Sequence, residues 1–134
     1  MKRKEYLFMI CSCDADNSVI YVEFSRQIRI DLSAAIEIVA NRLTFSNNEM
    51  HYLVADVSKV LEVTPEARKY LQRQDAGMKN ILGAALIASN PVAALIANIF
   101  IKTPKNFQAK FFYNKKDAFN WIYVRKQKTV VENQ

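Results

Sequence analysis

The stretch from Gly83 to Ile101 contains no charged side chain, and this feature limits what the chain can fold into more than any other. An apolar run of that length is compatible with a transmembrane helix. The tripeptide Ser-Asn-Pro at positions 89–91 interrupts the run, however, with residues that typically begin a helix. We therefore expect a buried strand over residues 81–88 and an apolar helix over residues 91–102, both too short to cross a bilayer.

Strand and helix patterns alternate along the rest of the chain. Residues 5–12 and 19–25 are rich in β-branched and aromatic side chains, and the turn formers at 13–18 between them predict a β-hairpin. Residues 51–57 and 108–113 are expected to form further strands. Helices are expected to begin at the N-cap candidates Asp31, Thr64 and Asn114.

This order, β-β-α-β-α-β-α-β-α, is typical of an α/β fold. Because βαβ crossovers place successive strands parallel, we expect a mixed, mainly parallel sheet with helices mostly on one face. A chain of 134 residues is near the commonest domain size, so we expect a single domain over residues 1–134. Residues 1–4 and about 126–134 are expected to be loose ends.

The helix that follows Asp31 has an amphipathic pattern, with one face predicted to be buried and the other exposed. The residues expected on its buried face are Leu32, Ala35, Ile36, Val39, Ala40 and Leu43. The residues expected on its solvent face are Ser33, Glu37, Asn41 and Arg42.

The side chains that usually carry catalysis or hold metals are few and scattered. His51 is the only histidine, and a single histidine at the start of a strand is more often structural or exposed than catalytic. Cys11 and Cys13 would point to one face of a strand, a poor geometry for a mutual disulfide and an incomplete ligand set for zinc. Asp56 and Glu62 could pair as carboxylates, but a turn acceptor and a surface acid are their more typical roles. We expect no catalytic residue, no metal, no cofactor and no enzyme activity, in a cytoplasmic protein with reduced cysteines.

Positive charge is concentrated near the C-terminus of a chain whose net charge is +6. Between residues 102 and 128 there is one acid, Asp117, beside the basic residues Lys102, Lys105, Lys110, Lys115, Lys116, Arg125, Lys126 and Lys128. This distribution predicts a positive field that favours anionic partners, including an anionic membrane surface. We do not expect nucleic acid as a partner, because no nucleic-acid-binding motif accompanies the charge.

One segment carries a family resemblance. Residues 53–67, LVADVSKVLEVTPEA, followed by a strand of small residues and a helix that begins with proline, resemble the STAS domains, the sulfate-transporter and anti-sigma-factor-antagonist (SpoIIAA-like) family. The resemblance covers most of the chain, which looks like a divergent bacterial member. It implies the SpoIIAA-like α/β fold and a non-enzymatic regulatory module that binds a protein partner.

The same resemblance indicates where the partner binds. In the antagonists of that family, a serine at the start of the corresponding helix is phosphorylated to switch partner binding. Here Pro65 or Glu66 stands at that place, whereas Asp56 and Ser58 match the family's strand-end pattern. The resemblance therefore implies a module that presents residues 57–66 without this switch, although Ser58 and Thr64 stay open as phosphorylation sites. Its implied contact residues are Asp56, Ser58, Thr64 and Glu66.

The predicted helix over residues 91–101 suggests an alternative function. Asn98 is its only polar side chain before Lys102, so both faces are apolar. The residues expected to face the sheet are Val92, Leu95, Ile96 and Ile99. The residues left for a second copy of the chain, an apolar ligand or a membrane surface are Ala93, Ala94, Ala97, Phe100 and Ile101. The alternative is a small carrier or sensor, and the helix also resembles that of small bacterial STAS or lipid-binding Sec14-like proteins.

Overall fold

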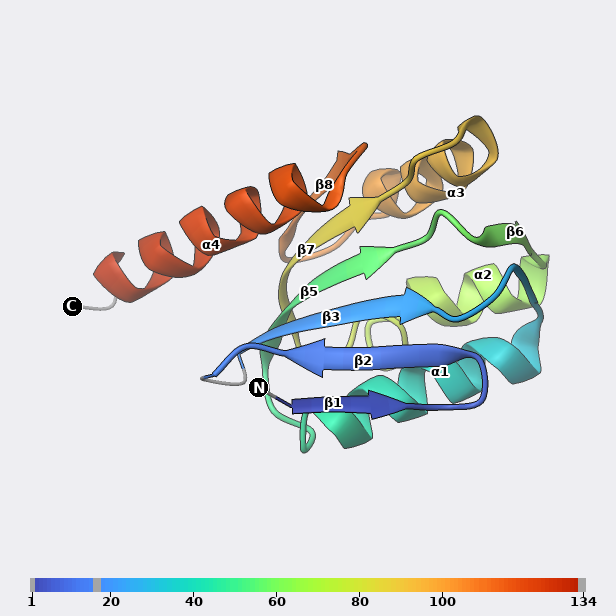
Figure 1. The fold of residues 1–134 in the computed structure, drawn as a ribbon, viewed down its shortest axis with the longest axis horizontal. Coiled ribbons are helices and arrows are strands. Elements are labelled where there is room, and N and C mark those ends of the chain that lie inside the picture. The colour runs from blue at the N-terminus through green and yellow to red at the C-terminus, as the bar shows by residue number, and fades with distance from the viewer. Residues whose placement is uncertain (1, 16–17, 133–134) are drawn as a thin grey trace.

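A computed structural model describes residues 2–15 and 18–132 of the chain. These residues form a six-stranded sheet with the strand order β1-β2-β3-β5-β7-β8 (Figure 1). Its strands are β1 (Lys2–Glu5), β2 (Met9–Cys13), β3 (Val19–Phe24), β5 (His51–Asp56), β7 (Ile81–Ile87) and β8 (Gln108–Phe112). The strands from β1 to β3 pair antiparallel, and those from β3 to β8 pair parallel. The predicted mixed, mainly parallel sheet is therefore confirmed.

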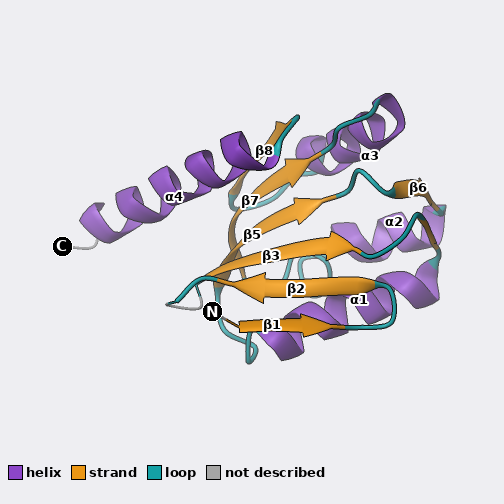
Figure 2. Ribbon diagram, viewed as in Figure 1, coloured by secondary structure: helices purple, strands orange, loops and turns teal. Residues whose placement is uncertain are grey.

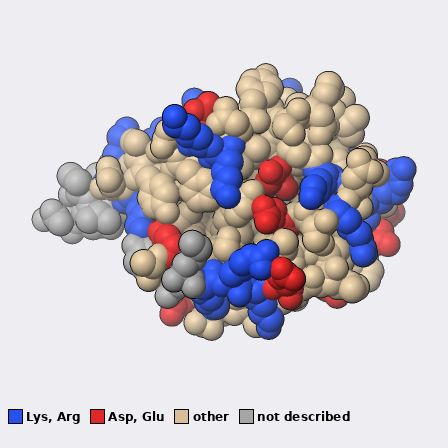
Figure 3. Space-filling view, viewed as in Figure 1, with Lys and Arg blue, Asp and Glu red and all other residues tan. Residues whose placement is uncertain are grey.

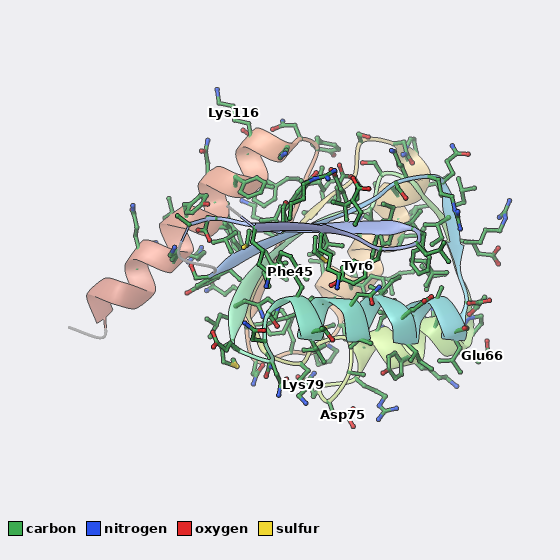
Figure 4. All side chains as sticks on the ribbon, turned by 60° about the horizontal axis from the view of Figure 1, so that its bottom comes forward. Tyr6, Phe45, Glu66, Asp75, Lys79 and Lys116 are labelled. Carbon is green, nitrogen blue, oxygen red and sulfur yellow. The ribbon has the colours of Figure 1, made fainter. Side chains whose placement is uncertain are left out.

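Helices α1 (Leu32–Phe45), α2 (Pro65–Gln72) and α3 (Pro91–Lys102) cover one face of the sheet, and α4 (Lys115–Glu132) crosses the other (Figure 2). Side-chain alternation along β7 explains this division. Leu86 packs with α3, whereas its neighbours Ala85 and Ile87 pack with Ala118 and Ile122 of α4. The view in Figure 4 shows α1 and α2 on the opposite side of the sheet from α4. The prediction that helices lie mostly on one face is confirmed.

The four expected helix starts form as the sequence predicts, and Asn90 of the Ser-Asn-Pro tripeptide is the N-cap of α3. Asp31 and Thr64 accept hydrogen bonds from the backbone N–H groups of Ala34 and Ala67, at 2.9 and 3.3 Å. The side chains of Asn90 and Asn114 accept from the N–H groups of Ala93 and Asp117, both at 2.9 Å. These bonds satisfy backbone donors that a helix start leaves unpaired, so they fix where each helix begins.

A short parallel pair, β4 (Ile28–Ile30) and β6 (Val60–Val63), was not anticipated from the sequence. Each strand is too short to show a strand pattern by itself, and each forms because the other lies beside it. The segment 57–66 is therefore partly strand and leads directly into α2.

Both predicted loose ends need correction. Lys2–Glu5 has exposed side chains, yet its backbone pairs with β2 and makes β1 the edge strand. The helix α4 continues through Glu132, well past the predicted start of a tail near residue 126. Residues 133–134 of that tail lie outside the described residues.

The predicted orientation of α1 is wrong in part. Leu32 and Ile36 are 41% and 45% exposed, whereas Arg42, expected in solvent, is 3% exposed. The buried positions of this helix are Ala35, Val39, Arg42 and Phe45. The guanidinium of Arg42 tolerates burial because polar atoms surround it, as described below.

Candidate functional site

An apolar cavity of about 140 Å³ lies between the sheet and the layer formed by α1, α2 and α3, and we call it the sheet–helix cavity. Its floor is formed by the side chains of Val22, Phe24, Leu53, Ala55, Ala84, Leu86 and Ala109. Its roof and rim include Ile38, Val39, Val57, Val60, Leu71, Met78, Ile96, Phe100 and Phe107. The charged side chains among its described lining residues are Arg42 and Lys105. This cavity was not predicted from the sequence.

Small side chains on the floor leave the space open. Leu53 of β5 is paired in register with Ala84 of β7, and Ala84 is paired with Ala109 of β8. Residues in register on parallel strands point to the same face, so two methyl groups lie side by side where larger side chains would meet the helices. The small side chains within residues 81–88 can be recognised in the sequence. Whether they leave a cavity depends on the distance between the sheet and the helices, which the sequence does not give.

Lys105 lies on the connection between α3 and β8, at the rim of the cavity, and is half-buried. Its Nζ donates to the carbonyl oxygens of Ile101 and Thr103, at 2.8 and 2.5 Å. Removal from water lowers the pKa of its ammonium group. The carbonyls at the end of α3 hold this cation in place, since the C-terminal end of a helix dipole attracts positive charge.

Arg42 lines the same cavity, but its hydrogen bonds are used to hold the fold. Its guanidinium donates to Nε2 of His51 at 2.9 Å. It also donates to the carbonyl oxygens of Lys79, Gly77 and Ala76, at 2.9, 3.2 and 3.4 Å. These contacts fasten α1 to the segment that precedes β7. Burial lowers the pKa of Arg42 to about 10, at which it still carries its charge at neutral pH.

His51 is fully buried, and both of its ring nitrogens have partners. Nδ1 lies 2.9 Å from the carbonyl oxygen of Glu49 and Nε2 lies 2.9 Å from Arg42, so Nδ1 donates and Nε2 accepts. Burial is the main cause that lowers the pKa of His51 to about 4. The ring is therefore neutral and structural, in agreement with the interpretation made from the sequence.

The remaining candidate catalytic side chains are likewise buried or already hold a hydrogen-bond or ion-pair partner. Asp56 accepts a hydrogen bond from the N–H of Ser58 at 2.9 Å and acts as a turn acceptor, while Glu62 pairs with Arg29 at 3.4 Å on the surface. Cys11 and Cys13 are buried and form no disulfide, and burial raises the pKa of Cys11 to about 12, so it is not a nucleophile at neutral pH. Across residues 2–15 and 18–132, no group of His, Cys, Asp and Glu side chains could hold a metal ion.

The predicted partner-binding residues occupy two places rather than one. Asp56 and Ser58 form the turn after β5, and Ser58 joins that turn to α3 because its Oγ accepts from the N–H of Ser89 at 3.0 Å. Asn90 also donates to the carbonyl oxygen of Ser58, at 2.7 Å. Thr64 and Glu66 lie beyond β6 at the start of α2, where Glu66 is exposed (Figure 4).

The predicted orientation of α3 is wrong except at Ile96, which is half-buried and faces the sheet–helix cavity as expected. Ala93 and Ala97, expected to face a partner, are fully buried against the sheet. Phe100 and Ile101 are half-buried and pack on the same cluster. The exposed side chains are instead Val92, Leu95 and Ile99, with 50%, 70% and 38% exposure. The two alanines, four residues apart, let the helix approach the sheet closely, which turns the larger side chains outward.

The basic residues of the C-terminal quarter are spread over several elements. Lys115 lies over the ring of Tyr21 at 4.4 Å, and Arg125 lies over the ring of Trp121 at 5.0 Å. Lys126 pairs with Asp14 at 3.4 Å. Figure 3 shows Lys and Arg in separate groups on one face, with acidic side chains between them. An anionic partner for this region stays a prediction.

Comparison with known proteins places this arrangement in a family. A family model described as a domain of unknown function, DUF7793, matches residues 13–125. The chain belongs to this DUF7793 family. Its match spans the sheet from the end of β2 onward and includes every residue of the sheet–helix cavity. No curated protein matches the sequence.

A solved structure identifies the fold of this DUF7793 domain. The crystal structure of an uncharacterised protein of the DUF3478 family from Shewanella loihica PV-4, described as having a SpoIIAA-like fold, is similar with a TM-score of 0.60. The similarity covers 89% of this chain and 98% of that one, at 15% sequence identity. It confirms the predicted SpoIIAA-like fold. In the described part of the chain, no helix is both long and apolar enough to span a membrane.

Proposed function

We propose that this DUF7793 domain is a non-enzymatic, cytoplasmic SpoIIAA-like module that presents segment 57–66 and the outer face of α3 to a protein partner. The observation that carries the proposal is the exposed stripe of Val92, Leu95 and Ile99, which we call the α3 stripe. These residues lie on one side of the helix, where an isolated soluble domain would place polar groups.

The α3 stripe and segment 57–66 are held together as one surface. Ser58 bonds to Ser89 and Asn90 at the start of α3, so the turn after β5 cannot move independently of that helix. β6 packs against α3, and its residue Leu61 is 38% exposed. A partner that covers the stripe therefore also meets the segment for which the family resemblance implies partner contacts.

We propose a binding role rather than an enzymatic one because the side chains of the described residues favour no reaction. His51 has both nitrogens occupied, the pKa of Cys11 is raised by burial, and Glu62 pairs with Arg29. Cysteines that form no disulfide are typical of a reducing compartment, which supports the cytoplasmic location that we propose.

The partner that can be tested with the purified chain is a second copy of it. Burial of an apolar side chain of this size stabilises by roughly 1.5–3 kcal/mol, so a few of them can hold a dimer at micromolar concentration. Leu95→Glu should lower the mass measured by light scattering from dimer to monomer. Leu7→Glu, at a similarly exposed residue on the β1–β2 connection, should leave the dimer intact. A wild-type chain that stays monomeric throughout the micromolar range contradicts self-association.

The sheet–helix cavity favours a second candidate function, the binding of an apolar ligand. It supports the carrier or sensor alternative, although the ligand would lie beneath α3 rather than on its outer face, with Ile96 and Phe100 in its wall. Mass spectrometry of the protein purified without detergent should detect a bound apolar molecule in the wild type. Ala84→Leu, which fills the floor of the cavity, should lose that molecule. A wild-type protein purified without any apolar ligand, and unable to bind one that is added, would contradict this second function.

A further inference from the structure

We propose that the sheet–helix cavity takes an amphiphilic anion, whose apolar chain lies in the cavity and whose carboxylate head group pairs with Lys105. This inference rests on the second function proposed above and names the chemical class of its ligand.

The shape of the cavity suits a chain rather than a compact ring. Lys105 and Phe107 precede β8, at the amino ends of the parallel strands, whereas Val57 and Val60 follow β5, at their carboxyl ends. The lining residues therefore extend along the strand direction, from the amino ends of the parallel strands to their carboxyl ends. Apolar cavities of about 150 Å³ stay dry and bind a molecule of about six carbon atoms, and this cavity has about 140 Å³. A short or medium alkyl chain matches both the direction and the size.

The charges of the lining select an anion. Arg42 and Lys105 are both positive, and the described lining residues include no Asp or Glu. A cationic head group would lie in a positive field with no acid to pair with, whereas a carboxylate gains attraction from both residues. A neutral head group can accept a hydrogen bond from them but gains no attraction between opposite charges.

Lys105 is the cation with capacity to bind a head group. An ammonium group has three N–H donors, and the carbonyl oxygens of Ile101 and Thr103 take two of them. The ion pairs found among the described residues do not include Lys105. Arg42, by contrast, uses four of its five N–H donors on His51 and three backbone carbonyls.

Two hydrogen bonds to neighbouring residues hold the connection that carries Lys105 at the rim of the cavity. Gln72 of α2 donates to Oγ1 of Thr103 at 2.9 Å, and Gln74 donates to the carbonyl oxygen of Pro104 at 3.3 Å. They fasten the α3–β8 connection to the end of α2 and the segment after it, so Lys105 has a fixed position between apolar walls. A head group bound there lies at the boundary between the cavity and water, where an amphiphile changes from chain to charge.

Calorimetric titration of the full chain with octanoate and with 1-octanol tests the inference, because the two probes share a chain length and differ in head-group charge. Octanoate should bind more tightly than 1-octanol, on the order of fivefold, as expected for a partly exposed ion pair. Lys105→Met should remove the preference for octanoate and change 1-octanol binding much less, and the retained 1-octanol binding shows that the variant is folded. Lys105→Arg should retain the preference for octanoate.

Lys102→Met is the matched control, since Lys102 is an exposed lysine of the same region that does not line the cavity. It should bind octanoate as the wild type does. Equal affinity of the wild type for the two probes, or an octanoate preference that survives Lys105→Met, would overturn the head-group inference while leaving apolar binding intact. Failure of the wild type to bind either probe would instead contradict the second proposed function itself.

Discussion

The two faces of the sheet are built from the same strands but packed differently. On the α4 face, Tyr21 packs against Phe119 with ring centroids 5.5 Å apart, and Phe112 packs against Trp121 at 5.8 Å. On the opposite face, alanines on the floor leave the sheet–helix cavity open beneath α3. Aromatic pairs fill the α4 face, whereas Ala84 and Ala109 leave room on the other. This difference in packing is what our proposal of a ligand-binding cavity on the α1–α3 face rests on.

The largest expected effect is on the packed face. Ile122→Ala removes a fully buried side chain of α4, and should lower the free energy of unfolding by about 2–5 kcal/mol. Ile96→Ala, on the cavity side, should cost at most about half as much, because Ile96 is half-buried beside an existing void. Urea denaturation of both variants measures the difference. Equal losses would mean that the two faces are packed alike.

Neighbouring alanines of β7 sharpen the comparison. Ala84 lines the cavity, whereas Ala85 is fully buried against α4. Ala85→Leu should destabilise the fold by about 1–3 kcal/mol through overpacking. Ala84→Leu should change the free energy of unfolding by less than about 1 kcal/mol, because space for the added atoms is already present. If Ala84→Leu is the more destabilising of the two, the cavity does not exist as described.

The buried pair of Arg42 and His51 predicts that stability depends on pH. The folded-state pKa of His51 is about 4, below the roughly 6.5 of an exposed histidine. Its contribution to stability is therefore present above pH 6.5 and is lost as the pH falls from there to 4, by up to about 1.4 kcal/mol per pH unit. His51→Gln keeps a donor and an acceptor without titrating, so its stability should fall less steeply over this range. Parallel slopes for the two proteins would contradict this account of His51.

The smallest expected effect on stability concerns the hydrogen bonds between segment 57–66 and α3. Asn90→Ala removes the N-cap of α3 and the bond to Ser58, and should lower the free energy of unfolding by about 1 kcal/mol. Asn114→Ala removes the cap of α4 but leaves those hydrogen bonds intact, and serves as the matched control. Hydrogen exchange at segment 57–66 should become faster only in Asn90→Ala. Unchanged exchange there would show that the bond between Asn90 and Ser58 does not restrain the segment.

Features that depend on local sequence were predictable. Asp31, Thr64, Asn90 and Asn114 begin helices because a side-chain oxygen reaches a nearby backbone N–H, and that requirement is visible in a few residues. The order of most strands and helices followed from the same kind of signal. The short pair β4 and β6 did not, because each strand depends on a partner distant in sequence.

Features that depend on packing between elements were not predictable. In a helix that is apolar all round, such as α3, periodicity does not determine which side faces the sheet, and Ala93 and Ala97 decided it by their size. Arg42 was expected in solvent because its partners, His51 and three backbone carbonyls, come together only in the fold. The sheet–helix cavity has the same origin, since its lining residues come from several elements.

The most direct test of the account is to measure the thermal unfolding of the wild type and of Ala84→Leu at increasing concentrations of 1-octanol. Binding to the folded state alone should raise the unfolding temperature of the wild type in a saturable manner. Ala84→Leu should fold normally yet show no rise, because the added side chain fills the floor where the ligand lies. A wild type that does not respond, or a rise of equal size in Ala84→Leu, would contradict the claim that the α1–α3 face holds a ligand-binding cavity.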